Sequence, residues 1–344
     1  MIGRARHVPR AGTVRISISG WTYPPWRGVF YPKGLPQTRE LDYATSQFNT
    51  LEINGTFYCM QRPTAFADWE NRAPDDFVYA VKGPRYITHM LKLRNAEAPL
   101  ANFIASGLLR LGAKLGPILW QFPPQFHFDA DRIEPFLRML PRDTQCAAEL
   151  GRRHDHRLKA PAWLDVDKNR KLRHAFEIRH DSFRDHAFIE LLRKYNVALV
   201  CADTVEWPLL MDLTSDFVYC RLHGSEELYA SAYDDASLDV WAARVAQWAT
   251  GREPANVERV GGKGRRLNRD VFVYFDNDAK VRAPFDAKAL HERVTMKMNL
   301  PLAVGERGST RSRSTTSPAR ATQTSGSSRS RSSAAHEKRN SSAP

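Results

Sequence analysis

The chain has 344 residues, of which 42% are hydrophobic, and its formal net charge is +13 at pH 7. This length and composition suit one large domain or two small ones with a sizeable core. No segment approaches the roughly 20 apolar residues of a membrane-spanning helix, and no apolar stretch follows the N-terminal arginines as in a secretory signal. We therefore expect a cytoplasmic protein without membrane contact.

Most of the positive charge lies at the two ends of the chain. Residues 305–344 hold eight Lys or Arg and two Glu, a net +6 (8 − 2), and three arginines near the N-terminus add +3. Residues 305–344 also contain twelve Ser and almost no large apolar side chains, so they cannot offset the entropy of ordering. We expect a flexible basic N-terminus over 1–13, one folded domain over 14–304, and a disordered Arg/Ser-rich tail over 305–344.

Short apolar runs that alternate with helical segments predict the fold. The runs are Val14–Trp21, Thr50–Tyr58, Phe77–Gly83, Pro117–Phe122, Ala175–His180, Ala198–Thr204, Phe217–Gly224 and Val271–Asp276. Segments with helical spacing lie between or after them: Glu40–Phe48, Thr64–Asn71, Leu100–Leu115, Ala130–Leu140, Asp185–Tyr195, Leu238–Ala249 and Ala287–Met298. Eight such units in about 290 residues predict an α/β fold, a single (β/α)8 TIM-like barrel. An open doubly wound sheet is the alternative, but SGWTYPPW after the first run is not a G-x-G-x-x-G turn.

Two features make the predicted barrel irregular. Only twelve residues separate Thr204 from Phe217, so the sixth connection is short or lacks a full helix. A basic insertion at about 141–173 lies between a helix and the next strand, where barrel loops open on the N-terminal face, away from the usual chemistry. Its His154 and His156 could bind a metal, but a solvated loop is favoured because no partner ligand is evident nearby.

Polar side chains recur near the carboxyl ends of the predicted strands. In TLEINGTFY, side chains alternate between two faces, so Leu51 and Ile53 face the helices while Glu52 and Asn54 face the lumen. The same alternation places further polar side chains in the lumen: Lys82, Gln121, Glu177, Arg179, Asp203, Arg221, His223, Asp276 and Asp278. Desolvating so many charges is costly, which favours a functional site at the carboxyl-terminal mouth over a buried ion-pair network that only fills the lumen. Asp278 has the alternative of capping the helix that follows it.

These side chains suit an enzyme that binds a phosphate-bearing substrate, either a nucleic acid or a phosphosugar. The candidates for binding the substrate are Trp21, Asn54, Lys82, Gln121, Arg179 and Arg221, of which the cations would hold the anion. The candidates for catalysis are Glu52, Glu177, His223 and Asp276. Mg2+ or Mn2+ could assist hydrolysis, because hard cations prefer carboxylate oxygen; the candidate ligands are Glu52, Glu177, Asp203 and Asp276.

Two other functions remain open. Metal-free chemistry on a carbohydrate would use Glu52 and Glu177 as the paired carboxyl groups, with Trp21 and Trp26 as sugar platforms. A non-catalytic nucleic-acid-binding protein would use the basic ends and the aromatic loops, and the lumenal charges would then be structural. The aromatic residues after the first strand suit stacking on a ligand and ordinary loop packing equally well.

Seven blocks of the sequence, in order, resemble the YecE-like family, the domain of unknown function numbered 72. The blocks are SGWTYPPWRGVFYP, LEINGTFY, FVYAVKGPRYITH, LGPILWQFPPQF, EIRHDSF, YCRLHG and VYFDND, and the resemblance spans roughly Ile16 to Leu290. It implies a TIM-barrel fold, in agreement with the strand count, and it implies no particular activity. The basic insertion and the Arg/Ser-rich tail depart from the family pattern, so the resemblance assigns neither of them a role.

Overall fold

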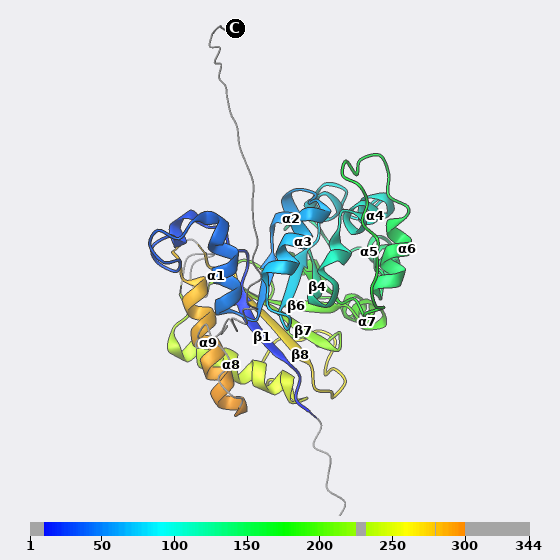
Figure 1. Cartoon of the computed structure of the whole chain (residues 1–344). Helices are drawn as coiled ribbons and strands as arrows, with labels where there is room; N and C mark the ends of the chain where they lie inside the picture. Colours follow the sequence, from blue (N-terminus) through cyan, green and yellow to red (C-terminus); the bar gives the residue numbers. More distant parts are fainter. Residues whose placement is uncertain (1–9, 225–231, 279, 300–344) are drawn as a thin grey trace, which may run out of the picture. The chain divides into compact units, whose positions relative to one another are not determined.

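The computed structural model describes residues 10–224, 232–278 and 280–299 (Figure 1). These residues form eight parallel strands: β1 (Val14–Ile18), β2 (Thr50–Ile53), β3 (Val78–Lys82), β4 (Leu115–Gln121), β5 (His174–Glu177), β6 (Ala198–Asp203), β7 (Phe217–Leu222) and β8 (Asp270–Phe275). Their order is β1-β8-β7-β6-β5-β4-β3-β2, so each strand lies beside its neighbours in the chain and β1 pairs with β8. A single bridge between Ser19 and Glu52 joins the β1 and β2 ends and nearly closes the barrel. The predicted barrel is confirmed.

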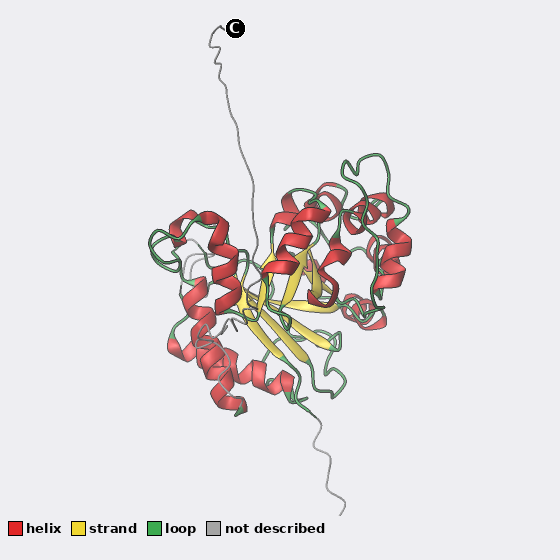
Figure 2. Cartoon of the chain, viewed as in Figure 1, coloured by secondary structure: helices red, strands yellow, loops and turns green. Residues whose placement is uncertain are grey.

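Helices lie around the strands (Figure 2). The described residues form these α-helices: α1 (Glu40–Gln47), α2 (Gly55–Tyr58), α3 (Pro63–Arg72), α4 (Glu97–Ala105), α5 (Ala130–Met139), α6 (Thr144–Gly151), α7 (His186–Lys194), α8 (Asp235–Ala249) and α9 (Ala283–Met298). Shorter helical turns are η1 (Pro24–Trp26), η2 (Gln37–Arg39), η3 (Tyr86–Met90, a π-helix), η4 (Leu108–Lys114) and η5 (Asp181–Phe183). All seven predicted helical segments correspond to helices, although the predicted Leu100–Leu115 is split. The split occurs at Gly107, whose φ of 117° favours glycine and whose Cβ would lie 2.6 Å from Pro63 Cα.

Strand alternation divides the core into two layers. Leu51 and Ile53 point outward and belong to the large apolar cluster between the strands and the helices. Inside the barrel, a second cluster combines small and aromatic side chains, including Ala80, Tyr219 and Tyr274. Above this apolar layer, the next inward positions on β2, β5 and β7 are charged, so the alternation brings charged side chains together at the carboxyl-terminal mouth.

Two connections differ from a regular barrel. Residues 204–216, between β6 and β7, contain no helix, which confirms that the sixth connection is short. The predicted second strand run was too long, because β2 ends at Ile53 and Gly55–Tyr58 form a helical turn. That turn is fixed to the neighbouring strand, since Thr56 Oγ1 donates to the Lys82 carbonyl oxygen at 2.7 Å.

The basic insertion follows a different course from the expected one. It begins with α6, whose N-terminus is capped by Asp143, and then continues as a loop. Asp155 in this loop bonds Asn102 of α4 twice, at 2.8 and 2.9 Å, and Arg157 Nη1 donates to Tyr86 Oη at 3.0 Å. Tyr86 follows the carboxyl end of β3, so the expectation that the whole insertion lies away from the carboxyl-terminal face is wrong. The alternation of strands and helices could not reveal where this loop is anchored.

The chain ends are mostly outside the described residues. The predicted tail over 305–344 and residues 1–9 of the predicted basic N-terminus lie outside them, while residues 10–13 continue into β1. None of the helices in the described ranges combines the length and apolar character that a bilayer-spanning segment requires.

Deleting residues 305–344 is expected to leave the thermal midpoint unchanged to within about 1 °C, because these residues carry almost no large apolar side chains that could contribute to a core. Thermal unfolding of the full chain and of the truncated chain, followed by circular dichroism, measures this. A clear drop in the midpoint would show that the tail packs on the barrel.

Candidate functional site

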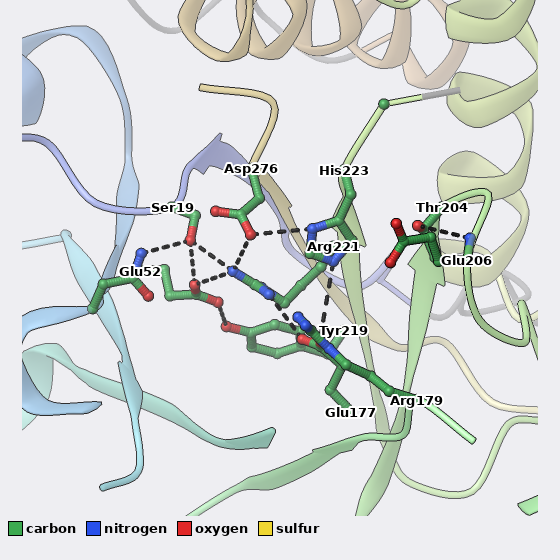
Figure 3. A network of polar contacts seen from close by, with 12 residues as sticks. Ser19, Glu52, Glu177, Arg179, Thr204, Glu206, Tyr219, Arg221, His223 and Asp276 are labelled. Carbon is green, nitrogen blue, oxygen red and sulfur yellow. Dashed lines mark hydrogen bonds and ion pairs between the residues drawn. The ribbon is translucent and has the colours of Figure 1, made fainter. Parts of the chain in front are cut away.

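Arg221, near the end of β7, is fully buried and lies at the centre of an ionic cluster (Figure 3). Its Nη1 donates to Glu177 Oε2 at 2.9 Å, and its Nη2 lies 3.0 Å from Glu52 Oε1 and 2.8 Å from Asp276 Oδ2. Ser19 Oγ also accepts from Nη2 at 2.9 Å. Although burial would lower the pKa of Arg221, the three carboxylates hold it well above its ordinary value. One guanidinium is thus shared by carboxylates from three sides of the barrel mouth.

Glu52 is bound through both carboxylate oxygens. Its Oε1 accepts from Ser19 Oγ at 2.5 Å as well as from Arg221, and its Oε2 accepts from Tyr219 Oη at 2.6 Å. Its side chain has no solvent-exposed surface. Because Ser19 follows β1 and the other partners lie on β7, Glu52 links the two sides of the incompletely closed barrel. This arrangement favours a structural role for Glu52 over the predicted catalytic one.

His223 lies between two of the carboxylates. Its Nδ1 is 3.1 Å from Asp276 Oδ2, and its Nε2 is 4.0 Å from Glu177 Oε1. Burial lowers the pKa of His223 despite these neighbours, so the imidazole is neutral at pH 7. For Asp276 and Glu177, burial alone would raise the pKa, but Arg221 and further cations hold both well below the usual carboxyl range. Asp276 is the more accessible partner, with 13% of its side chain exposed.

Lys82, at the end of β3, differs from the other cations of the mouth. No ion pair formed by the described residues includes Lys82, and its Nζ lies 4.4 Å from the centroid of the Phe57 ring. Burial and the nearby Arg221 lower its pKa from 10.5 to about 8, although Glu52, Asp276 and Glu177 act in the opposite direction. This ammonium group therefore has no close carboxylate among the described side chains.

Arg179 and Trp207 form one side of the mouth. Arg179 binds Glu177 Oε1 through Nε at 2.9 Å and Nη2 at 2.7 Å, and its guanidinium lies 4.1 Å from the Trp207 ring centroid. The Trp207 ring also meets His223 edge-on at 5.8 Å. Trp207 was not predicted, because it lies in the short β6–β7 connection where no alternation gives a signal. Ser19 and Tyr219 were also missed, although both have the alternation that identified Glu52 and Arg221.

Of the other predicted site residues, some contact the Arg221 cluster and others lie away from it. Asn54 reaches the cluster, since its Nδ2 donates to Ser19 Oγ at 2.9 Å, and Gln121 is buried at the end of β4. Trp21 packs edge-on against Trp69 of α3 at 5.9 Å. The prediction that Asp203 faces the lumen is wrong: its Oδ2 accepts from Trp241 Nε1 of α8 at 2.9 Å. Small residues such as Ala202 fill the lumen beside β6, so the last residue of that strand points toward the helices.

Asp278 lies beside the cluster and does not cap a helix. Helix α9 begins at Ala283, and its N-cap residue makes no side-chain cap. Burial, followed by the negative charge of Asp276, raises the pKa of Asp278 well above the usual range, although the nearby Tyr23 acts in the opposite direction. Burial and the charge of Asp276 therefore favour the protonated form of Asp278, next to a carboxylate whose pKa is lowered.

Within the described residues, the carboxylates of the mouth converge on Arg221 and leave no evident place for Mg2+ or Mn2+. Across the described ranges, no group of three or more His, Cys, Asp or Glu side chains could hold a metal ion, and this includes the surroundings of His154 and His156. Glu52, Glu177 and Asp276 do converge, but on the guanidinium of Arg221, which takes the place that a cation would need. With Asp203 on the outer face of β6, the four predicted metal ligands do not come together.

Comparison with known proteins places this barrel in a family. The family model described as "Protein of unknown function DUF72" matches residues 15–309. The UPF0759 protein YecE of Escherichia coli K12 is 29% identical over 140 residues, which is 36% of this chain and 49% of YecE, so the chain spans about half the length of the curated relatives it matches. A solved DUF72 family protein from Thermotoga maritima has a TM-score of 0.61 at 22% identity, covering 83% of this chain and 99% of the other. A second one, from Enterococcus faecalis, has a TM-score of 0.56 at 15% identity, covering 82% and 96%. The resemblance of the sequence blocks is thereby confirmed, and the chain belongs to the DUF72 family.

Proposed function

We propose that the chain is an enzyme that binds a phosphate-bearing substrate at the carboxyl-terminal mouth of the barrel. The observation that supports this anion site is Lys82, whose ammonium group has no carboxylate within ion-pair distance among the described residues. Burial, together with the positive charges of Arg179, Lys82 and Arg85, lowers the pKa of His89 to about 4, so positive potential accumulates on this side of the mouth. A phosphate group would supply the counterion that the described side chains do not provide.

In this proposal, Asp276 and Asp278 have opposite roles in proton transfer. The pKa of Asp278 is raised by burial and by the charge of Asp276, whereas the pKa of Asp276 is lowered, mainly by Arg221, and Asp276 contacts His223. Two carboxyl groups whose pKa values are moved in opposite directions suit an acid and a base in one site. Asp278 would donate a proton to a leaving group, and the Asp276–His223 pair would accept one from water or from a substrate hydroxyl. No metal ion takes part in this scheme.

The two alternatives have less support. In the carbohydrate alternative, Glu52 and Glu177 would flank a sugar, but both bind Arg221 and neither has exposed surface. The non-catalytic nucleic-acid alternative depends on basic ends that lie mostly outside the described residues. Oligonucleotide binding that survives Lys82→Met and is lost on deletion of residues 305–344 would favour that second alternative.

Lys82→Met is expected to weaken the binding of inorganic phosphate by at least about tenfold, because it removes a cation that has no carboxylate partner among the described residues. In the wild type, binding should also weaken as the pH rises through about 8, where Lys82 loses its proton. Isothermal titration calorimetry at pH 7 and pH 9 measures both effects. Lys288→Met, which changes a half-buried lysine of α9, is the matched control and should bind as the wild type does.

Lys82→Met is expected to stabilise the fold although it weakens phosphate binding. Because the pKa of Lys82 is lower in the folded state than its ordinary 10.5, the charged form destabilises the fold below about pH 8. Lys82→Met should therefore raise the free energy of unfolding at pH 7 by about 1–2 kcal/mol, and this gain should disappear between pH 8 and 10.5. Phosphate binding that is unchanged in Lys82→Met would contradict the proposed anion site.

A further inference from the structure

Exposed apolar side chains gather in one groove beside the mouth. Tyr58 is 68% exposed and Met90 is 67% exposed, and Met60 and Tyr86 are exposed as well. All four line a cavity of about 520 Å³ between the segments that follow β2 and β3. Exposed apolar surface concentrated in a hollow is typical of a ligand or partner site, and this volume is in the range of small-molecule sites.

Two arginines give the groove a positive charge. Arg85 and Arg157 both line it, and the described lining residues include no Asp or Glu. Arg157 comes from the basic insertion, and its guanidinium donates to the Tyr86 hydroxyl at 3.0 Å. Asp155 fixes this position, since it bonds Asn102 of α4 and accepts from the Arg157 backbone N–H at 2.9 Å. Arg157 of the insertion therefore places a positive charge at the edge of the apolar groove.

The groove adjoins the proposed anion site through Phe57. The Phe57 ring lines the groove, and the same ring lies 4.4 Å from Lys82 Nζ and meets His89 edge-on at 5.1 Å. One ligand could therefore contact Lys82 with one end and the groove with the other.

We propose that the substrate is an aromatic phosphate, whose ring lies in this groove and whose phosphate lies between Lys82 and Arg85. The ring would pack against Tyr58, Phe57 and Met90, and the Arg157 guanidinium would close over it. The positive charge and the absence of described lining carboxylates favour an anion over a neutral apolar ligand, and they disfavour a basic peptide. This inference rests on the proposed function, since it takes Lys82 as the phosphate ligand.

The test compares 1-naphthyl phosphate with inorganic phosphate by isothermal titration calorimetry of the full chain. The wild type should bind the naphthyl ester at least about tenfold more tightly, because the ring buries apolar surface in the groove. Tyr58→Ser together with Met90→Ser should abolish this preference and leave the binding of inorganic phosphate unchanged. Val240→Ser, at an exposed apolar position on α8, is the matched control and should keep the preference.

A second pair of variants tests the insertion. Arg157→Gln should weaken naphthyl phosphate binding by about threefold to tenfold, whereas Arg152→Gln removes the same charge from the same insertion and should have no effect. If the wild type binds 1-naphthyl phosphate and inorganic phosphate equally tightly, the aromatic-phosphate inference is overturned. If phosphate binding still depends on Lys82 in that case, the proposed function stands. If the wild type prefers 1-naphthyl phosphate but Lys82→Met does not weaken its binding, two proposals are overturned: the Lys82 anion site and the single ligand that contacts both Lys82 and the groove.

Discussion

Replacing Arg221 with methionine is expected to lower the free energy of unfolding by roughly 3–5 kcal/mol, as for other buried charges that lose their partner. The guanidinium makes contacts of 2.8–3.0 Å with Glu177, Glu52 and Asp276, and its side chain has no exposed surface. Without it, three buried carboxylates would face one another in the barrel mouth. Methionine fills a similar length, so the loss would come from charge rather than from a cavity.

The dependence of this effect on pH identifies its cause. Arg221 holds the pKa values of Glu177 and Asp276 below those of the unfolded chain, so both contribute stability that is present above about pH 4. In the wild type, that stability is lost as the pH falls toward the folded-state pKa values of Glu177 and Asp276. Arg221→Met lacks this contribution at every pH. Urea unfolding should therefore show the largest difference between wild type and variant above about pH 5, with a smaller difference at pH 3.

Arg152→Met, an exposed change in the insertion, is the control and should unfold as the wild type does at every pH. A loss below about 1 kcal/mol in Arg221→Met would show that another cation or water replaces the guanidinium, which would contradict the role of Arg221 as the centre of the cluster.

Alternation along strands predicted most of the cluster, because the period of two is imposed by backbone geometry and does not depend on distant contacts. Glu52, Glu177 and Arg221 were each placed correctly, since apolar residues beside them on the other face of their strands fixed the direction, and Asp276 was placed correctly by continuing the alternation past the end of β8. Asp203 was misplaced because β6 is apolar on both faces. In ALVCAD, the lumenal Ala198, Val200 and Ala202 and the outer Leu199 and Cys201 are all apolar, so polarity gives no direction.

Other features depend on contacts between distant segments and could not be predicted in the same way. The course of the insertion is set by the pairing of Asn102 with Asp155, which lie 53 residues apart. Strand alternation also cannot show whether converging carboxylates surround a metal ion or a guanidinium. Here the alternation placed Arg221 in the lumen together with the carboxylates. Only the distances in the structure show that the carboxylates surround the guanidinium.

The last prediction concerns Glu52, whose role the sequence left open between catalysis and structure. Glu52→Gln is expected to lower the free energy of unfolding by roughly 3 kcal/mol, close to the cost of breaking a buried ion pair. Glutamine has one carbonyl oxygen where glutamate has two acceptors, so it cannot accept from Arg221 and Ser19 on one side and from Tyr219 on the other. Glu190→Gln, an exposed change on α7, should unfold as the wild type does.

Combining the two substitutions distinguishes the structural role from the catalytic one. If Glu52 stabilises the fold by pairing with Arg221, Glu52→Gln should become neutral or stabilising in the Arg221→Met background, because it then removes a like charge from beside Glu177 and Asp276. A catalytic Glu52 would behave differently: its loss would cost about 1 kcal/mol or less in the wild-type background, while ligand binding or turnover fell much further. Denaturant unfolding of the two single variants and the double variant decides between these outcomes without knowledge of the substrate, because the structural role requires a loss of roughly 3 kcal/mol that is present in the wild-type background and absent in the Arg221→Met background.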